Sequence, residues 1–205
     1  LGGEIGETLV AHFKGQPQPC VIVNRSLSGV ACVRVNYLAG AFQAVSHLAD
    51  LGHKRIGFVG QAATDPTQVA LLAGYKSALQ KLGLHPDPRW IAPDSHSAFV
   101  QGAQLPTAFF VAGQFHTFPF YREARNRHMR IPEDIAVVGF DDDTNEADLS
   151  PPLTTVAQPH GEVGEKAVDL LIAGIEGGQI QQQYWVIDPH FVLRESCGGA
   201  QSSLG

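Results

Sequence analysis

The amino-acid sequence predicts an α/β protein with doubly wound parallel sheets. Short apolar runs, typical of strands buried on both faces, alternate with longer stretches whose apolar residues repeat at helical spacing. Glycines directly follow several of the helical stretches, as residues at helix C-termini do. An acidic turn, Asp141 to Asp143, follows the apolar run 135–140. Open α/β sheets bind small molecules beyond the carboxyl ends of their strands, so this turn is a candidate ligand site.

The apolar runs predict the strands. Four short runs are expected to be buried strands: 20–24, 55–60, 107–113 and 135–140. Within the last run, Gly139 is expected to allow a close approach by its neighbours, because it has no side chain. Residues 183–195 are expected to be extended, with Pro189 at an edge or a bend.

The helical stretches alternate with these strands, which implies a parallel sheet. Four stretches are expected to be helices: 5–13, 41–51, 71–82 and 163–174. Gly52 and Gly83 are expected to end the second and third of them. Residues 91–104 have little helical periodicity, so the sequence favours no helix there.

The composition predicts a soluble globular chain. Its 205 residues are 44% hydrophobic and 17% charged, enough for one domain or two small lobes. The net charge is −6, so no footprint for nucleic acid is expected within this stretch. Three cysteines without CxxC spacing favour reduced thiols in a cytoplasmic protein. No apolar run approaches the roughly 20 residues that span a bilayer, and no membrane partner or secretory leader is expected.

The motifs of common enzyme classes do not occur in the sequence. It has no GxSxG, GxGxxG or GxxxxGK pattern, which removes the sequence support for a serine hydrolase, a dinucleotide enzyme or a P-loop NTPase. Its nine histidines form no HxxxH or HExxH pair. We therefore expect no enzyme, no metal and no cofactor.

Several stretches, in order along most of the chain, resemble the lactose-repressor and galactose-repressor (LacI/GalR) family of bacterial transcription regulators. They are HLADLGHKRIGFVG (47–60), GYKSALQKLGL (74–84), LPTAFFVAG (105–113), IPEDIAVVGFDD (131–142) with SPPLTTV (150–156), and FVLRESCG (191–198). The resemblance implies an effector-binding domain of the periplasmic-binding-protein-like type I fold, with two lobes around a ligand cleft.

The resemblance also implies the lobe boundaries. Residues 1–40 and 158–178 would form the amino-terminal lobe, and residues 41–157 and 179–198 the carboxyl-terminal lobe, with a tail at 199–205. The return at 151–159 would be a hinge, since its prolines fix the backbone at the start of a crossing segment. In the family, further βα units and a helix-turn-helix precede the matching region, and we expect them ahead of Leu1.

The strongest candidate for ligand binding is Asp141. It matches the family position that accepts hydrogen bonds from ligand hydroxyls, although an aspartate there could instead cap the following turn. Gly113 and Gln114 stand where the family has an Asn-Asp pair that serves the cleft. Phe115 belongs to an aromatic group that either lines the cleft or fills the core.

Other matching positions depart from the family. Leu71 stands where many members carry an arginine that holds the ligand, and Asn36 and Tyr37 stand where an Asp-Asn pair is usual. These changes imply a ligand other than the commonest sugars of the family, or a cleft that has lost its ligand.

Three functions are consistent with these patterns. The first is the sensing and dimerisation domain of a DNA-binding regulator: a sugar or related metabolite binds between the lobes, the protein is a homodimer, and a helix-turn-helix outside this chain contacts operator DNA. The second is a periplasmic sugar-binding protein of the same fold. The third is a magnesium-dependent α/β enzyme that uses Asp141 and Asp142.

Overall fold

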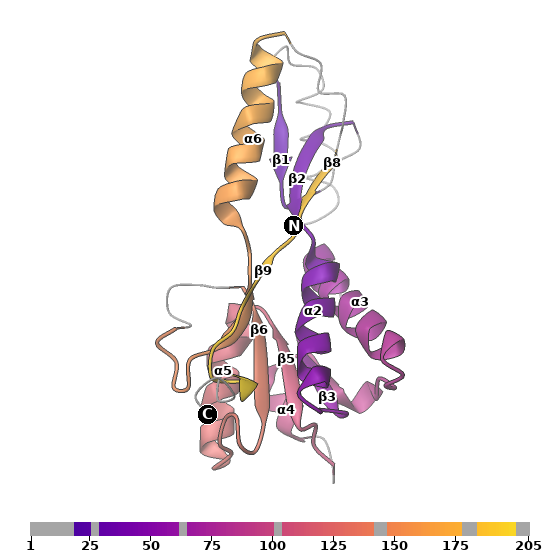
Figure 1. Ribbon diagram of the computed structural model, residues 1–205, viewed down its shortest axis with the longest axis vertical. Coiled ribbons are helices and arrows are strands. Elements are labelled where there is room, and N and C mark those ends of the chain that lie inside the picture. Colours follow the sequence, from indigo (N-terminus) through magenta and orange to yellow (C-terminus); the bar gives the residue numbers. More distant parts are fainter. Residues whose placement is uncertain are drawn as a thin grey trace. The chain divides into compact units, whose positions relative to one another are not determined.

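The chain divides into two compact units, each with its own sheet (Figure 1). The computed structural model describes residues 19–25, 29–61, 65–100, 104–141, 147–177 and 184–199. Unit 1 consists of Leu1–Asn36 and Pro159–Asp188, and unit 2 of Tyr37–Gln158 and Pro189–Gly205. The backbone therefore passes from one unit to the other three times.

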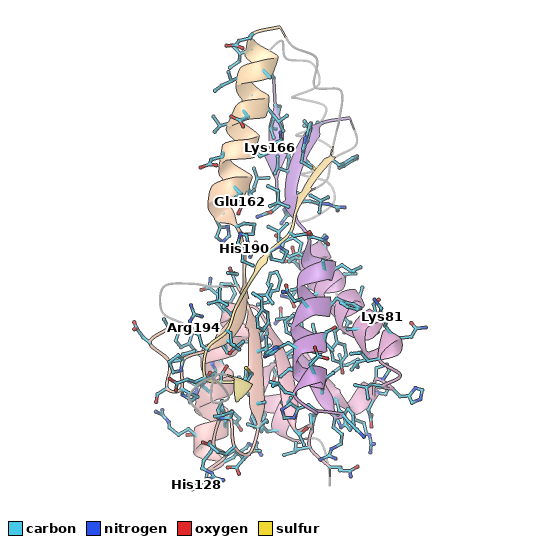
Figure 2. The ribbon with its side chains drawn as sticks, viewed as in Figure 1. Lys81, His128, Glu162, Lys166, His190 and Arg194 are labelled. Atoms are coloured by element: carbon cyan, nitrogen blue, oxygen red, sulfur yellow. The ribbon has the colours of Figure 1, made fainter. Side chains whose placement is uncertain are left out.

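Unit 1 has a parallel three-stranded sheet. Its strands are β1 (Val21–Val23), β2 (Ala31–Val35) and β8 (Tyr184–Ile187), in the order β1-β2-β8. Helix α6 (His160–Ile175) packs on β1 and β2 and buries one apolar face. Lys166 on this helix (Figure 2) places its ammonium 5.6 Å from the ring centre of Trp185 in β8.

Unit 2 has a six-stranded sheet in the order β4-β3-β5-β6-β7-β9. Its strands are β3 (Ile56–Val59), β4 (Ile91–Ala92), β5 (Ala108–Ala112), β6 (Ala136–Phe140), β7 (Thr154–Ala157) and β9 (His190–Val192). Neighbouring strands are parallel except at β7 and β9. Strands β5 and β6 are buried along their whole length, as the continuous apolar runs predict.

Helices cover both faces of this sheet. They are α2 (Tyr37–Asp50), α3 (Pro66–Lys81), the 3-10 turn η1 (Pro88–Trp90), α4 (Ser95–Val100) and α5 (Gln114–Asn126). Adjacent residues of β5 point toward the helices on opposite faces of the sheet. The Phe110 ring lies 5.8 Å from Phe58, which contacts Tyr75 of α3. The Phe109 ring lies 5.1 Å from Phe120 of α5. The predicted doubly wound α/β fold is confirmed.

Most of the predicted elements are present, but strands β2 and β7 were not predicted, and helix α3 begins at Pro66, five residues before its predicted start. Gly52 and Gly83 have positive φ angles of 95° and 68°, as expected of residues that end helices. Helix α2 begins at Tyr37, four residues before the predicted start. The stretch 91–104, where no helix was predicted, contains β4 and the six-residue helix α4. The predicted helix 5–13 lies outside the described residues.

The predicted lobe boundaries differ from the two units in three places. Strand β8 pairs with β2, so residues 184–187 belong to unit 1 and not to the carboxyl-terminal lobe. Residues 37–40 begin α2 and belong to unit 2. Gln158, predicted in the amino-terminal lobe, belongs to unit 2. Among the described residues, no helix combines the length and hydropathy needed to cross a membrane.

Candidate functional site

Asp141 directly follows β6, where the parallel strands of unit 2 end. Its backbone has a φ of 89°, a conformation that aspartate tolerates better than most residues. Its N–H donates to Val156 O at 3.0 Å, and its carbonyl accepts the Thr155 hydroxyl at 2.8 Å. These two hydrogen bonds hold the backbone of Asp141 against β7. The residue is half-buried at the carboxyl edge of the sheet. Asp142 and Asp143 lie outside the described residues.

Tyr37 links the start of α2 to the start of α3 at the same edge of the sheet. Its hydroxyl donates to Gln158 Oε1, just after β7, at 3.3 Å, and its ring lies 5.7 Å from the ring of Phe140 at the end of β6. Burial is the main cause that raises the pKa of this hydroxyl, while a hydrogen bond with Thr67 lowers it. The charges of Asp141 and Asp65 raise this pKa further.

The end of β5 leads straight into α5. Gly113 occupies the N-cap position with a φ of 106°, which favours glycine. Gln114 is the first helical residue and is half-buried, and Phe115 is 85% exposed. Phe115 therefore does not fill the core. The prediction that it lines a ligand cleft stays a prediction.

Gln68 of α3 reaches across to the end of β5. Its amide Nε2 donates to Ala112 O at 3.0 Å. Its Oε1 is buried and has no hydrogen-bond partner in the part of the chain that the structure describes. A Cβ at Gly60, at the end of β3, would lie 2.5 Å from this oxygen, so glycine makes room for the amide. Buried acceptors without a partner are uncommon, and a ligand or a water molecule commonly completes them.

Two predicted site residues do not join this group. Leu71 is 1% exposed and packs in the core of unit 2, so its side chain does not reach the surface. Asn36 belongs to unit 1, where its Nδ2 donates to Asp188 Oδ1 at 2.7 Å and its N–H to Ile187 O at 2.8 Å. Within unit 2, the structure brings together Tyr37 and Asp141, and it places Gln114 at the end of a neighbouring strand.

Four polar residues at this edge were not predicted as site residues: Asp65, Thr67, Gln68 and Gln158. A local signal existed for the first two. Asp65 caps α3, accepting the Thr67 N–H at 2.8 Å, and Pro66 occupies the first turn, a combination typical of helix starts. Gln158 gave no such signal, because its contact with Tyr37 joins residues 121 positions apart.

The arrangement suits binding by hydrogen bonds. Carboxylate, amide and hydroxyl groups collect at the ends of β5, β6 and β7 and at the starts of α2 and α3, so they can accept hydrogen bonds from a polar ligand. In the described ranges, no cluster of three histidine, cysteine or acidic side chains could hold a metal ion. A parallel α/β sheet with polar side chains at its carboxyl edge is the common frame of a small-molecule-binding protein.

Comparison with known proteins gives the family. A family model described as a periplasmic binding protein-like domain matches residues 45–197. The chain belongs to this family, and the resemblance to LacI-type regulators is confirmed. The HTH-type transcriptional repressor CytR of Escherichia coli K12 is 32% identical over 174 residues, which cover 80% of this chain and 51% of CytR. The chain thus spans about half the length of this relative.

Two solved structures of related proteins are similar to this chain in fold as well as in sequence. A regulatory protein of the LacI family from Chloroflexus aggregans is 29% identical with a TM-score of 0.84, over 92% of this chain and 72% of that one. A LacI family transcriptional regulator from Enterococcus faecium with bound ribose is 26% identical with a TM-score of 0.81, over 93% and 74% of the two chains.

Proposed function

We propose that this chain is the sensing domain of a LacI-type transcription regulator, and that a sugar or related metabolite binds at the carboxyl edge of unit 2. The observation that carries this proposal is at the ends of β6 and β7, where the Tyr37 hydroxyl donates to Gln158 Oε1 and the charge of Asp141 raises the pKa of that hydroxyl. A relative with bound ribose supports a polyhydroxylated ligand. Ligand binding would shift an equilibrium between two conformations and so change the affinity for operator DNA.

Asp141 is expected to accept hydrogen bonds from the ligand. Asp141→Asn should weaken binding by about tenfold to a hundredfold, because hydrogen bonds to a charged acceptor contribute roughly 1.5–3 kcal/mol. Asparagine is a cleaner substitution than alanine, since it tolerates the positive φ of this position. A thermal-shift screen of pentoses, hexoses and nucleosides would find a ligand, and calorimetry would measure its dissociation constant.

The control is Asp148→Asn, which makes the same change at an exposed aspartate of the connection between β6 and β7. Its affinity should equal that of the unaltered protein. Equal affinity in the Asp141 variant would remove Asp141 from the site. No binding of any probe to the unaltered protein would count against the sensing function itself.

The proposed regulator is a homodimer, and α5 offers a surface for the second copy. Residues of α5 help to line a surface pocket, whose apolar lining residues include Phe118, Met129 and Leu149. Arg122, Arg125 and Glu133 are among its charged residues. Basic and acidic side chains on one patch can pair with each other across a two-fold axis, because both copies present the same surface. Phe118 is 43% exposed, as a contact residue for a partner should be.

Phe118→Glu is expected to raise the dissociation constant of the dimer by about thirtyfold or more, the effect of losing a central aromatic contact. Sedimentation over a range of concentrations measures this constant. Leu82→Glu is the matched control, because Leu82 is 40% exposed and lies at the end of α3, away from the pocket. Equal dissociation constants in both variants would place the dimer contact elsewhere.

The remaining parts of the proposal concern partners and place of action. Operator DNA would bind through a helix-turn-helix outside this chain, in the cytoplasm, with no catalytic step. The names of the relatives favour this regulator over a periplasmic binding protein. A magnesium-dependent enzyme is the weakest candidate, because the relatives are named as transcriptional repressors and regulators.

A further inference from the structure

Cys197 lies at the opposite end of the unit 2 strands from Asp141. The preceding residue, Ser196, ties the carboxyl-terminal segment to the starts of β6 and β7. Its carbonyl accepts the Val137 N–H at 2.8 Å, and its hydroxyl accepts the Thr154 N–H at 2.8 Å. Arg194 (Figure 2) is on the same segment and donates Nη1 to Leu153 O at 2.7 Å. Cys197 is therefore held firmly, and it is separate from the proposed ligand site.

Three groups from three segments converge on the sulfur of Cys197. His47 Nε2 of α2 and Thr154 Oγ1 of β7 each lie 3.3 Å from Sγ. The Gly199 N–H also donates to it. Thr154 Oγ1 accepts the Arg194 N–H at 2.9 Å, and its own hydrogen can be donated to a thiolate at Cys197. Such a set of donors favours a negative charge on sulfur.

Burial and these donors act in opposite directions. Burial tends to raise the pKa of the Cys197 thiol and is the largest influence, but the hydrogen bonds from His47 and Thr154 bring the pKa below its usual value. The charge of His47 acts in the same direction. Thiolate is the reactive form of cysteine, so this thiol is activated although it is 3% exposed.

We propose that Cys197 is a site of oxidation by hydroperoxides. The thiol proton passes to the His47 imidazole, and the thiolate attacks one peroxide oxygen. The sulfur–oxygen bond forms as the oxygen–oxygen bond breaks, and the departing hydroxide takes the proton from His47 as water. The thiol is oxidised by two electrons to a sulfenic acid and the peroxide is reduced.

The added oxygen has little room where the sulfur lies. A Cβ on Gly199 would come within 3.5 Å of both Sγ and His47 Nε2, so the sulfur is enclosed by close neighbours. The turn that carries it is short, closed by the Gly198 N–H donating to Glu195 O at 3.0 Å. A sulfenic acid would break the hydrogen bonds to His47 and Thr154 and loosen this turn. Local opening of the same turn admits a molecule as small as hydrogen peroxide.

His47 is a positioning residue as well as the proton acceptor. Its ring packs against Phe191 of β9, with centroids 4.7 Å apart, which fixes the direction of Nε2 toward the sulfur. His47→Phe keeps an aromatic ring at this place and removes the nitrogen. The pair of Thr154→Val and Thr154→Ser separates the hydroxyl from the shape of the threonine side chain.

The test exposes the folded protein to hydrogen peroxide, traps sulfenic acid with dimedone and measures the label on each cysteine by peptide mass spectrometry. Cys197 should be labelled faster than the fully buried Cys32. The labelling rate of Cys197 should rise with pH, and in the folded protein it should reach half its maximum at a lower pH than in urea-unfolded protein. Equal labelling of Cys197 and Cys32, or the same midpoint pH in folded and unfolded protein, would overturn the proposal.

The variants test the route through His47. His47→Phe and Thr154→Val should each slow labelling by about tenfold, because the thiolate fraction falls when a hydrogen-bond donor to the sulfur is removed. Thr154→Ser should keep the rate. Circular dichroism checks that each variant is folded, and the comparison of the cysteines in the unaltered protein stands even where a variant fails to fold. Unchanged rates in folded His47→Phe and Thr154→Val would rule out the proposed route.

Discussion

Replacing Gly74 by alanine is expected to destabilise unit 2 by roughly 3 kcal/mol, the upper part of the usual range for an overpacked core. Helices α2 and α3 cross at this glycine. An added Cβ would lie 2.3 Å from the Leu38 carbonyl oxygen and 2.8 Å from Ala41 Cβ. The first of these is a backbone atom, which cannot turn aside as a flexible side chain could. The two helices would have to separate, and the apolar contacts between them would be lost.

Urea unfolding followed by circular dichroism measures this loss. Gly164→Ala is the matched control, because Gly164 is also inside a helix but a Cβ there meets no atom within 4 Å. Alanine at position 164 should stabilise its helix by roughly 0.5–1 kcal/mol through propensity alone. If alanine lowers the unfolding free energy at position 74 and raises it at position 164, the close approach of α2 and α3, and not helix propensity, determines the effect at Gly74. Stabilisation by Gly74→Ala would contradict the packing described for α2 and α3.

Phe120→Ala is expected to lower the free energy of unfolding of unit 2 by about 3–5 kcal/mol. Phe120 is fully buried on the inner face of α5. Its ring centre lies 4.8 Å from that of Phe99 in α4 and 5.1 Å from that of Phe109 in β5, so it joins two helices to the sheet. Alanine would leave a cavity among these rings, because the surrounding backbone relaxes only in part.

Phe115→Ala makes the same change five residues earlier in the same helix. Phe115 is 85% exposed, so its loss should alter the unfolding free energy by no more than about 0.5 kcal/mol. The difference in unfolding free energy between the two variants, measured by urea unfolding, gives the contribution of burying the ring. A small effect at Phe120 would mean that α5 is not packed on β5 as described.

The elements of unit 2 could be predicted because their signals are local. The run from Ala136 to Phe140 is continuously apolar, and a strand buried on both faces needs such a run. Asp141 could be singled out for the same reason, since it directly follows that run. The early start of α2 was missed because Tyr37 is apolar on its ring and polar at its hydroxyl. In the structure its ring continues the buried face of the helix.

What could not be predicted depends on contacts between distant segments. Strand β8 has an alternating pattern of half-buried and exposed residues, and nothing in it says which sheet it joins. Its pairing with β2 is decided by the path of the backbone between the units. The burial of Leu71 and the hydrogen bond between Tyr37 and Gln158 likewise follow from packing in three dimensions.

Because unit 2 is built from two separate segments of the chain, it cannot complete its fold until the second segment has been synthesised. Its first segment ends at Gln158, and its last begins at Pro189, after the chain has passed through unit 1. During synthesis, the edge of β7 and the Thr154 N–H stay unpaired until β9 and Ser196 are made, and these follow the Pro159–Asp188 segment of unit 1. A nascent chain that has not yet reached His190 therefore has an unpaired edge at β7, a form prone to join other chains. The segment that begins at Pro189 completes a unit whose first helix began at Tyr37.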